Sequence, residues 1–523
     1  MRNFDLPGRS AAYGLNGMAA TSSPLATLAA VDVLKAGGNA VDAAVTASAV
    51  LCITEPHMTG IGGDCFALVG LPDGSVHGLN GSGRSAAAAD GDWLKHTSLT
   101  EIAPTSIHSV TVPGAIDAWA ALLKRFGTMD LAAALAPAIR HAEEGVPTTP
   151  RVAMDWPESV ELLAADEGGA KHYLKDGRAP AVGDIMRYPT LANTLRQIAR
   201  EGRDGFYCGT IARDMLATLA PRGSLLTAED FAGNRPDWVE PISTMFAGHE
   251  ILEIPPSGQG LTALIALNIL SHFDLGRYGA ASVERRHLET EAMKLAWVLR
   301  NRHIAEHGTP VAELLSAAAA DRLAGMIRMD RAIESPEDMI AKPGSDTVYL
   351  AAADKSGLVV SFINSIYYGF GVGIVTPGTG ITLQNRGANF VAIPGHPNCI
   401  GPSKRPLHTI IPAMVRTEGK IAMAYGVMGG NYQPMGHVAV AVNRFIHGMD
   451  PQEAIDFPRA FPEMGELRIE TGISDSIAKG LTGLGHKVVA AAEPLGGGQA
   501  IAINNGLLTG GSDPRKDGCV LGF

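Results

Sequence analysis

Apolar and small residues recur at helical spacing in two neighbouring stretches near the start of the chain. The first stretch, 23–35, ends at Ala36-Gly37-Gly38, a sequence typical of a helix C-terminus. The second, 39–53, is apolar on nearly every side, so we expect a helix that is buried all round. The glycines between them predict a tight corner, and we therefore expect an αα-hairpin whose residues serve packing.

A β-like pattern marks a hairpin about two thirds of the way along the chain. The runs 347–353 and 358–366 have strand character, and Asp354-Lys355 with Gly357 predicts the turn between them. The stretch 331–345 before the hairpin has prolines, charges and no hydrophobic period, which indicates a surface linker. Glycines then crowd in where the backbone must turn tightly or approach another group: Gly369, Gly371, Gly373, Gly378 and Gly380.

Helical and strand-like patterns intermingle along the rest of the chain. At 523 residues, this mixture favours a large layered α/β fold, either as one unit or as two or three domains. The expected helices are 115–125, 131–144, 191–201, 261–270, 287–302 and 313–329, and the expected strands are 250–254, 420–425, 486–491 and 501–504.

The composition excludes several classes of protein. Apolar residues make up 46% and charged residues 18%, and the chain has 62 glycines, which suits an α/β enzyme rich in tight turns better than a disordered or fibrous chain. The net charge is −11, and no cluster of Lys and Arg forms a basic face. This charge pattern argues against nucleic acid as a partner.

Cysteines and apolar segments bear on redox chemistry and location. The five cysteines are scattered and form no CxxC pair, so we expect buried free thiols and no zinc site. The first 17 residues contain no apolar leader, and the longest apolar segments, such as 43–53, are too short to span a bilayer. These observations predict a cytoplasmic protein without a membrane partner.

A glycine-rich turn lies ahead of the predicted strand 65–69. It lacks the lysine of a P-loop and fits no GxGxxG pattern, so we expect a turn that brings backbone close to the site rather than a phosphate cradle. We expect His57 in this turn to be structural, and the role of Asp64 at its end stays open.

Four segments carry a family resemblance: GGNAVDAAV at 37–45, the stretch around Asp346-Thr347, KRPLHTIIPAM at 404–414 and SDPR at 512–515. With them the chain resembles the γ-glutamyltransferase family from about residue 20 to its end. The resemblance implies an N-terminal-nucleophile hydrolase fold, an αββα sandwich of four layers around two antiparallel sheets. It also implies a precursor that cuts itself between Asp346 and Thr347 into a large subunit (1–346) and a small subunit (347–523). These would stay intertwined as one domain and could assemble as a dimer of heterodimers.

A threonine at a new N-terminus can hydrolyse an amide without a histidine base. Its α-amine, with a reference pKa near ~8, accepts the hydroxyl proton at neutral pH. The sequence has no GxSxG elbow and no visible Ser-His-Asp arrangement. By the resemblance, Thr347 is the nucleophile, the N–H groups of Gly429 and Gly430 stabilise the oxyanion, and Ser365 replaces a family threonine that hydrogen-bonds the nucleophile.

The predicted substrate-binding residues depart from the family pattern. Arg84 matches the family arginine that holds the substrate carboxylate with its forked donors. However, Asn389 stands where the transpeptidases carry an acidic residue for the substrate α-ammonium, and Arg386 replaces a glutamine. A lost carboxylate and a gained arginine favour an anionic substrate over one recognised by its α-amine. The other replacements are His408-Thr409 for a Ser-Ser pair and Tyr367 for an asparagine.

These observations lead us to expect hydrolysis, rather than transfer, of γ-glutamyl compounds such as glutathione, without a cofactor or a metal. One alternative substrate is a small anionic amide such as oxamate, because it has no α-ammonium. Another alternative is that the protein is an acylase that removes glutaryl side chains. The non-enzymatic alternative is an uncut relative that only binds small carboxylates. The segment between Phe390 and Gly401 is short, so we expect no lid loop over the site.

Overall fold

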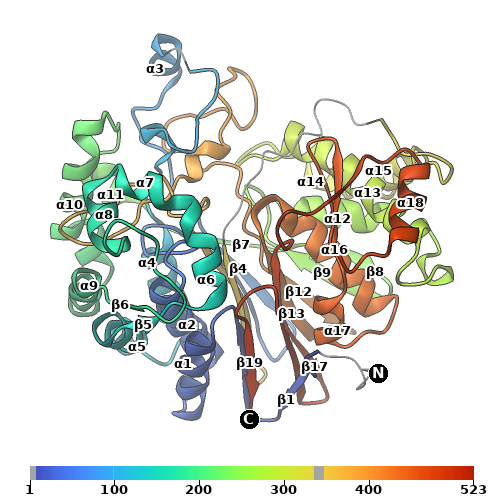
Figure 1. Ribbon diagram of the computed structural model, residues 1–523, viewed down its shortest axis with the longest axis horizontal. Coiled ribbons are helices and arrows are strands. Elements are labelled where there is room, and N and C mark those ends of the chain that lie inside the picture. The colour runs from blue at the N-terminus through green and yellow to red at the C-terminus, as the bar shows by residue number, and fades with distance from the viewer. Residues whose placement is uncertain (1–7, 98, 335–346) are drawn as a thin grey trace.

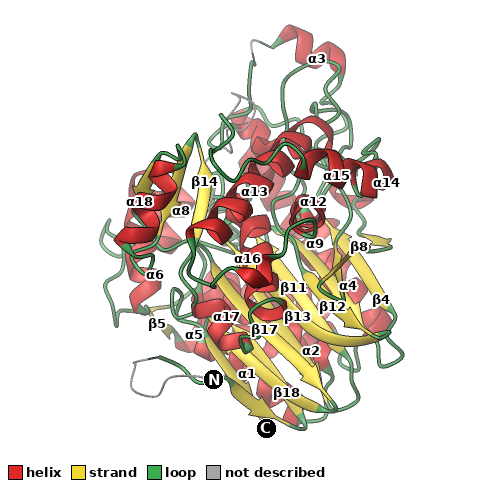
Figure 2. Cartoon of the chain, turned by 90° about the vertical axis from the view of Figure 1, so that its right-hand side faces the viewer, coloured by secondary structure: helices red, strands yellow, loops and turns green. Residues whose placement is uncertain are grey.

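Two seven-stranded sheets lie face to face at the centre of the molecule (Figures 1 and 2). The computed structural model describes residues 8–97, 99–334 and 347–523. Within each of these two sheets, all neighbouring strands are antiparallel. The first sheet has the order β1 (Ala12–Gly14), β18 (Leu507–Ser512), β17 (Gly497–Asn504), β13 (Lys420–Met428), β12 (Ala413–Thr417), β9 (His249–Glu253) and β8 (Ile242–Phe246). The second has the order β19 (Cys519–Gly522), β2 (Gly17–Thr21), β10 (Val348–Asp354), β11 (Val359–Ser365), β3 (Asp64–Gly70), β4 (Val76–Gly81) and β7 (Asp237–Val239).

Helices cover the outer face of each sheet. Helix α2 (Ala40–Thr54) packs on β10 and β11, whereas α12 (Gly260–Leu270) and α16 (Gln433–Phe445) pack on β8, β9 and β13 of the other sheet. Figure 1 shows these two groups of helices on opposite sides of the sheets. The predicted αββα sandwich is confirmed.

Further helices and two small sheets surround this frame. The remaining helices of the described residues are α1 (Pro24–Lys35), α3 (Gly91–His96), α4 (Ala115–Phe126), α5 (Leu131–Glu144), α6 (Pro150–Asp155), α7 (Val160–Ala164), α8 (Glu167–Tyr173), α9 (Pro189–Tyr207), α10 (Thr210–Leu219), α11 (Ala228–Gly233), α13 (Val283–His303), α14 (Val311–Leu314), α15 (Ala317–Ala324), α17 (Pro451–Asp456) and α18 (Asp475–Gly483). Two small sheets pair β5 (Val146–Pro147) with β6 (Ile185–Met186), and β15 (Glu466–Ile469) with both β14 (Ala460–Glu463) and β16 (Val488–Ala490). Among the 3-10 turns, η6 (Arg386–Asn389) and η7 (Gly430–Tyr432) lie at the site described below.

The second predicted helix is buried on all sides, as its sequence indicates. Every residue of α2 except the last is buried. Asn39 caps the helix with a capping box, in which its side chain accepts a hydrogen bond from the Asp42 N–H and the Asp42 carboxylate accepts one from the Asn39 N–H. Asp42 also accepts the N–H groups of Thr128 and Met129, so the one carboxylate in this apolar helix is satisfied.

The predicted hairpin around Thr347 forms the middle of the second sheet. Strands β10 and β11 pair Val348 with Asn364, so Thr347 lies opposite Ser365 at the open end of the hairpin. Strand β11 pairs Ser365 with Asp64 at the start of β3. Chain from before residue 335 (β2 and β3) therefore flanks chain from after residue 346 (β10 and β11) in one sheet.

Some predicted boundaries are wrong. The single helix expected at 313–329 is two helices, α14 and α15, because Ser316 is extended between them and its side chain caps α15. The strand expected at 486–491 shrinks to Val488–Ala490. Most of the predicted linker 331–345, and Asp346 after it, lie outside the described residues.

Two further expectations concern apolar helices and thiols. Within the part of the chain that the structure describes, no helix combines the length and the apolarity that a bilayer crossing requires. All five cysteines are free, as predicted, but only Cys52 and Cys65 are buried. Cys208 is exposed because it follows the end of α9 on an outer helix layer.

Candidate active site

Three adjacent strands bring polar side chains together at one end of the second sheet. Thr347 precedes β10, Ser365 ends β11 and Asp64 begins β3. The hydroxyls of Thr347 and Ser365 are hydrogen-bonded at 3.3 Å, and both residues are buried. The predicted nucleophile and its predicted partner therefore meet as the sequence suggests.

Ser365 is in turn held by a buried arginine. Its Oγ accepts hydrogen bonds from Arg386 Nη2 at 3.0 Å and from the N–H of Tyr367 at 2.8 Å. The second Arg386 nitrogen, Nη1, donates to Thr409 Oγ1 at 2.7 Å, and the guanidinium lies 4.3 Å from the centroid of the Tyr367 ring. Burial lowers the pKa of Arg386 to about 10, so the side chain stays positively charged at neutral pH.

The same hydrogen-bonded chain continues to the predicted oxyanion-binding glycines. Gln259, in the loop between β9 and α12, donates through Nε2 to the carbonyl of Thr409 at 2.7 Å and to that of Gly430 at 3.0 Å. Gly429 has φ 116° and Gly430 has φ 54°, which only glycine adopts without strain. A Cβ on Gly429 would lie 2.9 Å from Gly496 Cα, so this turn also needs the small residue for space.

The facing strands of the two sheets meet near this turn. The Tyr349 ring, two residues after Thr347, fills the space where a side chain on Gly426 would sit. Gly426 is in β13, which ends at Met428, next to the glycine pair. Thr347 and the Gly429-Gly430 turn therefore belong to one end of the sandwich, each coming from a different sheet.

Asp64 organises the backbone around these residues, a role that its sequence left open. Its buried carboxylate accepts hydrogen bonds from the N–H groups of Gly83 and Gly114 at 2.9 and 3.1 Å and from Gln384 Nε2 at 2.8 Å. It also lies 3.1 Å from His408 Nε2. Burial lowers the pKa of His408 to about 3, so this imidazole is neutral at pH 7.

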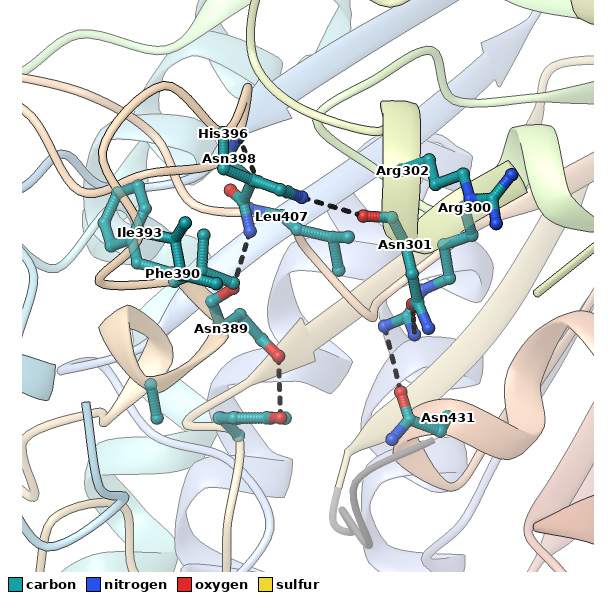
Figure 3. Close-up of a pocket in the computed structure, with 13 residues that line it drawn as sticks. Arg300, Asn301, Arg302, Asn389, Phe390, Ile393, His396, Asn398, Leu407 and Asn431 are labelled. Carbon is teal, nitrogen blue, oxygen red and sulfur yellow. Dashed lines mark hydrogen bonds between the residues drawn. The ribbon is translucent and has the colours of Figure 1, made fainter. Parts of the chain in front are cut away.

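A cavity of about 600 Å³ opens beside Tyr367. Figure 3 shows its two walls, with the segment from Asn389 to Asn398 on one side and the end of α13 with Asn431 on the other. Among the described residues no Asp or Glu lines it, whereas Arg300, Arg302 and His396 do. A volume in this range suits a drug-sized ligand, and the charge of the lining suits an anion.

Asn389 presents a hydrogen-bond donor to this cavity. The Tyr367 hydroxyl donates to Asn389 Oδ1 at 2.7 Å, which fixes the orientation of the amide. Asn389 Nδ2 is buried and finds no acceptor among the described residues. The position where the sequence analysis expects a missing carboxylate therefore carries an amide N–H₂ group, which matches a substrate oxygen and not an ammonium.

Comparison with known proteins identifies the family of this site. The family model of gamma-glutamyltranspeptidase matches residues 26–523. The chain belongs to the gamma-glutamyltranspeptidase family. It is 37% identical to the glutathione hydrolase-like YwrD proenzyme of Bacillus subtilis, over 98% of this chain and 99% of that one. It is also 34% identical to the oxamate amidohydrolase proenzyme of Klebsiella pneumoniae, over 97% of this chain and 98% of that one.

A solved structure of the family matches the whole chain. The cephalosporin acylase of Bacillus halodurans superposes with a TM-score of 0.93 at 42% sequence identity, covering 100% of this chain and 99% of that one. The chain is therefore a hydrolase of the gamma-glutamyltranspeptidase family, and the relatives named above are proenzymes.

Four residues predicted as substrate ligands do not line the cavity: Arg84, Arg386, His408 and Thr409. Arg84 pairs with Glu306 at 2.5 Å and with Asp237 at 3.4 Å, so acidic residues of the chain already occupy its guanidinium. His408 is completely buried against Asp64. The predicted role of Arg84 as a substrate ligand stays a prediction, and the geometry of His408 is that of a structural support.

Three residues of this site have no predicted role. Gln259 lies between the expected strand 250–254 and the expected helix 261–270, Arg300 lies within the expected helix 287–302, and Asn431 directly follows the glycine pair. The structure joins Arg300 Nη2 to Asn431 Oδ1 at 3.0 Å, on the wall of the cavity. A lone asparagine after Gly429-Gly430 was the one local signal for this pair.

One group of described residues has the makeup of a metal site, and it lies away from the cavity. His287 Nδ1 is 2.8 Å from His486 Nε2, and Glu291 lies close to both. Lys294 Nζ donates to Glu291 Oε1 at 2.7 Å, so an ammonium already balances the carboxylate. Burial lowers the pKa of His486 to about 3, and each side chain of this cluster already has a hydrogen-bond or ion-pair partner.

Proposed function

We propose that this protein is a self-processing amide hydrolase in which Thr347 becomes an N-terminus and attacks the substrate carbonyl. The proposal is supported by the relatives, which are named as proenzymes, and by the hydrogen bond between the buried hydroxyls of Thr347 and Ser365. The predicted cut follows Asp346, outside the described residues, and would divide the chain into subunits of residues 1–346 and 347–523.

In this mechanism the freed α-amine of Thr347 takes the hydroxyl proton as the oxygen attacks the amide carbonyl. The N–H groups of Gly429 and Gly430 receive the negative charge that develops on the carbonyl oxygen. The amine product leaves with the proton, and water then hydrolyses the threonyl ester. Arg386, which packs against the Tyr367 ring, holds the Ser365 hydroxyl by a hydrogen bond and in this way positions the nucleophile.

The preferred acyl group in our proposal carries a carboxylate and no α-ammonium, as a glutaryl group does. The observation that carries this choice is the lining of the cavity, which offers the Asn389 amide and, among the described residues, no carboxylate that could pair with an α-ammonium. The solved structure from Bacillus halodurans is named a cephalosporin acylase, which agrees with an acyl substrate other than a γ-glutamyl compound. A γ-glutamyl group is the second candidate, because the Bacillus subtilis relative is named glutathione hydrolase-like.

A matched pair of substrates tests the choice. Glutaryl-4-nitroanilide and γ-glutamyl-4-nitroanilide share the leaving group and differ only by the α-ammonium. We expect the glutaryl compound to have the higher kcat/KM, by about tenfold or more, because an unpaired ammonium in this cavity costs at least one lost charge-assisted hydrogen bond. A preference for the γ-glutamyl compound would support glutathione instead, and ammonia release from oxamate alone would support the third substrate.

Self-processing is tested on the same preparations. Mass spectrometry of the wild type should find two fragments divided before Thr347, and Thr347→Ala should remain one chain. Thr347→Ser is the matched control, because it keeps a hydroxyl and should still be cut. An intact wild-type chain without hydrolysis of any of these amides would contradict the proposal and favour a carboxylate-binding protein.

A further inference from the structure

Arg300 is a buried cation that has no carboxylate partner among the residues the structure describes. It lies near the C-terminal end of α13, is 6% exposed and lines the cavity. Its guanidinium donates only to amide oxygens, those of Asn431 at 3.0 Å and Asn301 at 3.2 Å, and it stacks 4.3 Å from the ring of Trp297. Its Nε is buried and has no acceptor among the described residues.

Most of the other buried arginines of the described chain, unlike Arg300, form an ion pair with a carboxylate. Among the described residues, six arginines are buried, and four of them pair with a carboxylate: Arg285, Arg286, Arg405 and Arg459. The two without such a pair are Arg300, which lines the cavity, and Arg386, whose guanidinium lies against the Tyr367 ring without lining the cavity. Because a buried charge without a counter-charge is costly, an uncompensated arginine that lines a cavity indicates that an anion binds there.

The two cations serve different sides of the reaction. Arg386 is fully buried and hydrogen-bonds Ser365, so it acts on the nucleophile. Arg300 faces the cavity and is joined to Asn431, the residue after the Gly429-Gly430 turn. Arg300 lies on the wall of the cavity opposite Asn389 (Figure 3), the position assigned here to the acyl group, so it is placed to meet the leaving group.

We propose that Arg300, held by Asn431 and Trp297, binds a carboxylate on the amine part of the substrate. This inference rests on the proposed function and extends it, because it defines the substrate class as an amide between a carboxylated acyl group and a carboxylated amine. The described hydrogen bonds use one N–H of Nη1 and one of Nη2, so each of these nitrogens keeps a second N–H for a carboxylate oxygen. Asn431 and Asn301 orient the fork without neutralising it.

Two chromogenic substrates test this assignment. Glutaryl-4-nitroanilide and glutaryl-3-carboxy-4-nitroanilide have the same acyl group, and only the second has a carboxylate on the leaving group. We expect the wild type to prefer the carboxylated compound, and Arg300→Gln to lose that preference by about 10- to 100-fold, mainly through KM. Arg322→Gln, which removes the same charge from the exposed surface of α15, is the matched control and should keep the wild-type preference.

Folding and catalysis are separated from binding by two further measurements. Arg300→Lys is the second variant, in case Arg300→Gln does not fold. It should retain part of the preference because it keeps the positive charge, and lose the rest because it lacks the planar guanidinium fork. Calorimetry with 5-amino-2-nitrobenzoate, the carboxylated amine product, needs no turnover, and its affinity should fall at least tenfold in the Arg300 variants. Equal effects of Arg300→Gln on both substrates, or unchanged affinity for this amine, would overturn the inference. A wild type that binds the amine but hydrolyses neither anilide would contradict the proposed function alone.

Discussion

Replacing Asn389 by Asp should change which acyl group the cavity accepts. The side chains have nearly the same shape, and the Tyr367 hydroxyl can donate to a carboxylate oxygen as it now does to Asn389 Oδ1 at 2.7 Å. The second oxygen would take the place of the buried, unpartnered Nδ2. Asn389→Asp therefore puts a negative charge into a lining that has none among the described residues.

The size of the effect follows from the charge and its surroundings. An ammonium and a carboxylate ~4 Å apart attract each other by ~4 kcal/mol at an effective dielectric constant of ~20. Desolvation offsets part of this, and hydrogen bonds to charged groups contribute about 1.5–3 kcal/mol in measured cases. With a net value of about 2 kcal/mol, the ratio of kcat/KM for γ-glutamyl-4-nitroanilide over glutaryl-4-nitroanilide should rise about 30-fold.

Steady-state kinetics with the two anilides at low salt measures this ratio directly. Asn389→Ala is the control, because it removes the amide without adding a charge, and the ratio should then shift by less than about threefold. An Asn389→Asp ratio equal to that of the wild type, in a protein that is still cut before Thr347, would refute the assignment of this position to the acyl group.

Three other substitutions test the supports of the site. Ser365→Ala removes the hydroxyl 3.3 Å from that of Thr347 and should lower kcat about 10- to 100-fold with little change in KM, whereas Ser365→Thr should restore most of it. The folded-state pKa of His408, lowered by burial to about 3, is below its usual value near ~6.5. The unfolded chain therefore binds one more proton between these values, and the free energy of unfolding should fall by about 1.4 kcal/mol per pH unit as the pH drops below ~6.5. In His408→Gln, denaturant titrations between pH 7.5 and ~5 should show a slope shallower by this amount, and an identical slope would contradict a neutral buried imidazole. Gly429→Ala forces a Cβ to 2.9 Å from Gly496 Cα at a φ of 116° and should lower the free energy of unfolding by about 1–3 kcal/mol, seen as a lower Tm.

Much of the fold is encoded in local patterns. The apolar stretch 39–53 makes a helix buried on all sides because no face of it could lie in water, and α2 does so. The turn at Asp354-Lys355 folds the two runs of the hairpin back on each other, which sets Ser365 opposite Thr347. The split of 313–329 at Ser316 was missed because a side-chain cap competes with the helix by only a small free energy, which periodicity does not detect.

The family motifs located the reacting groups, but not the charges around them. Thr347 and Ser365 are hydrogen-bonded as predicted, and a chain of hydrogen bonds that was not predicted continues through Arg386, Thr409 and Gln259 to Gly430. The role of Asp64, by contrast, cannot be predicted from the sequence alone. Its partners come from four other segments of the chain.

The sequence by itself determined most of the helices and the central hairpin, and it predicts Thr347 as the nucleophile and Asn389 in place of an acidic residue. Only the tertiary structure decided which arginines remain free to bind an anion. Arg84 is neutralised by Glu306, which lies 222 residues away in the sequence, whereas Arg300 meets only amide oxygens. The physical reason is that burial and counter-charges depend on groups brought together by packing, and neither spacing nor composition records them.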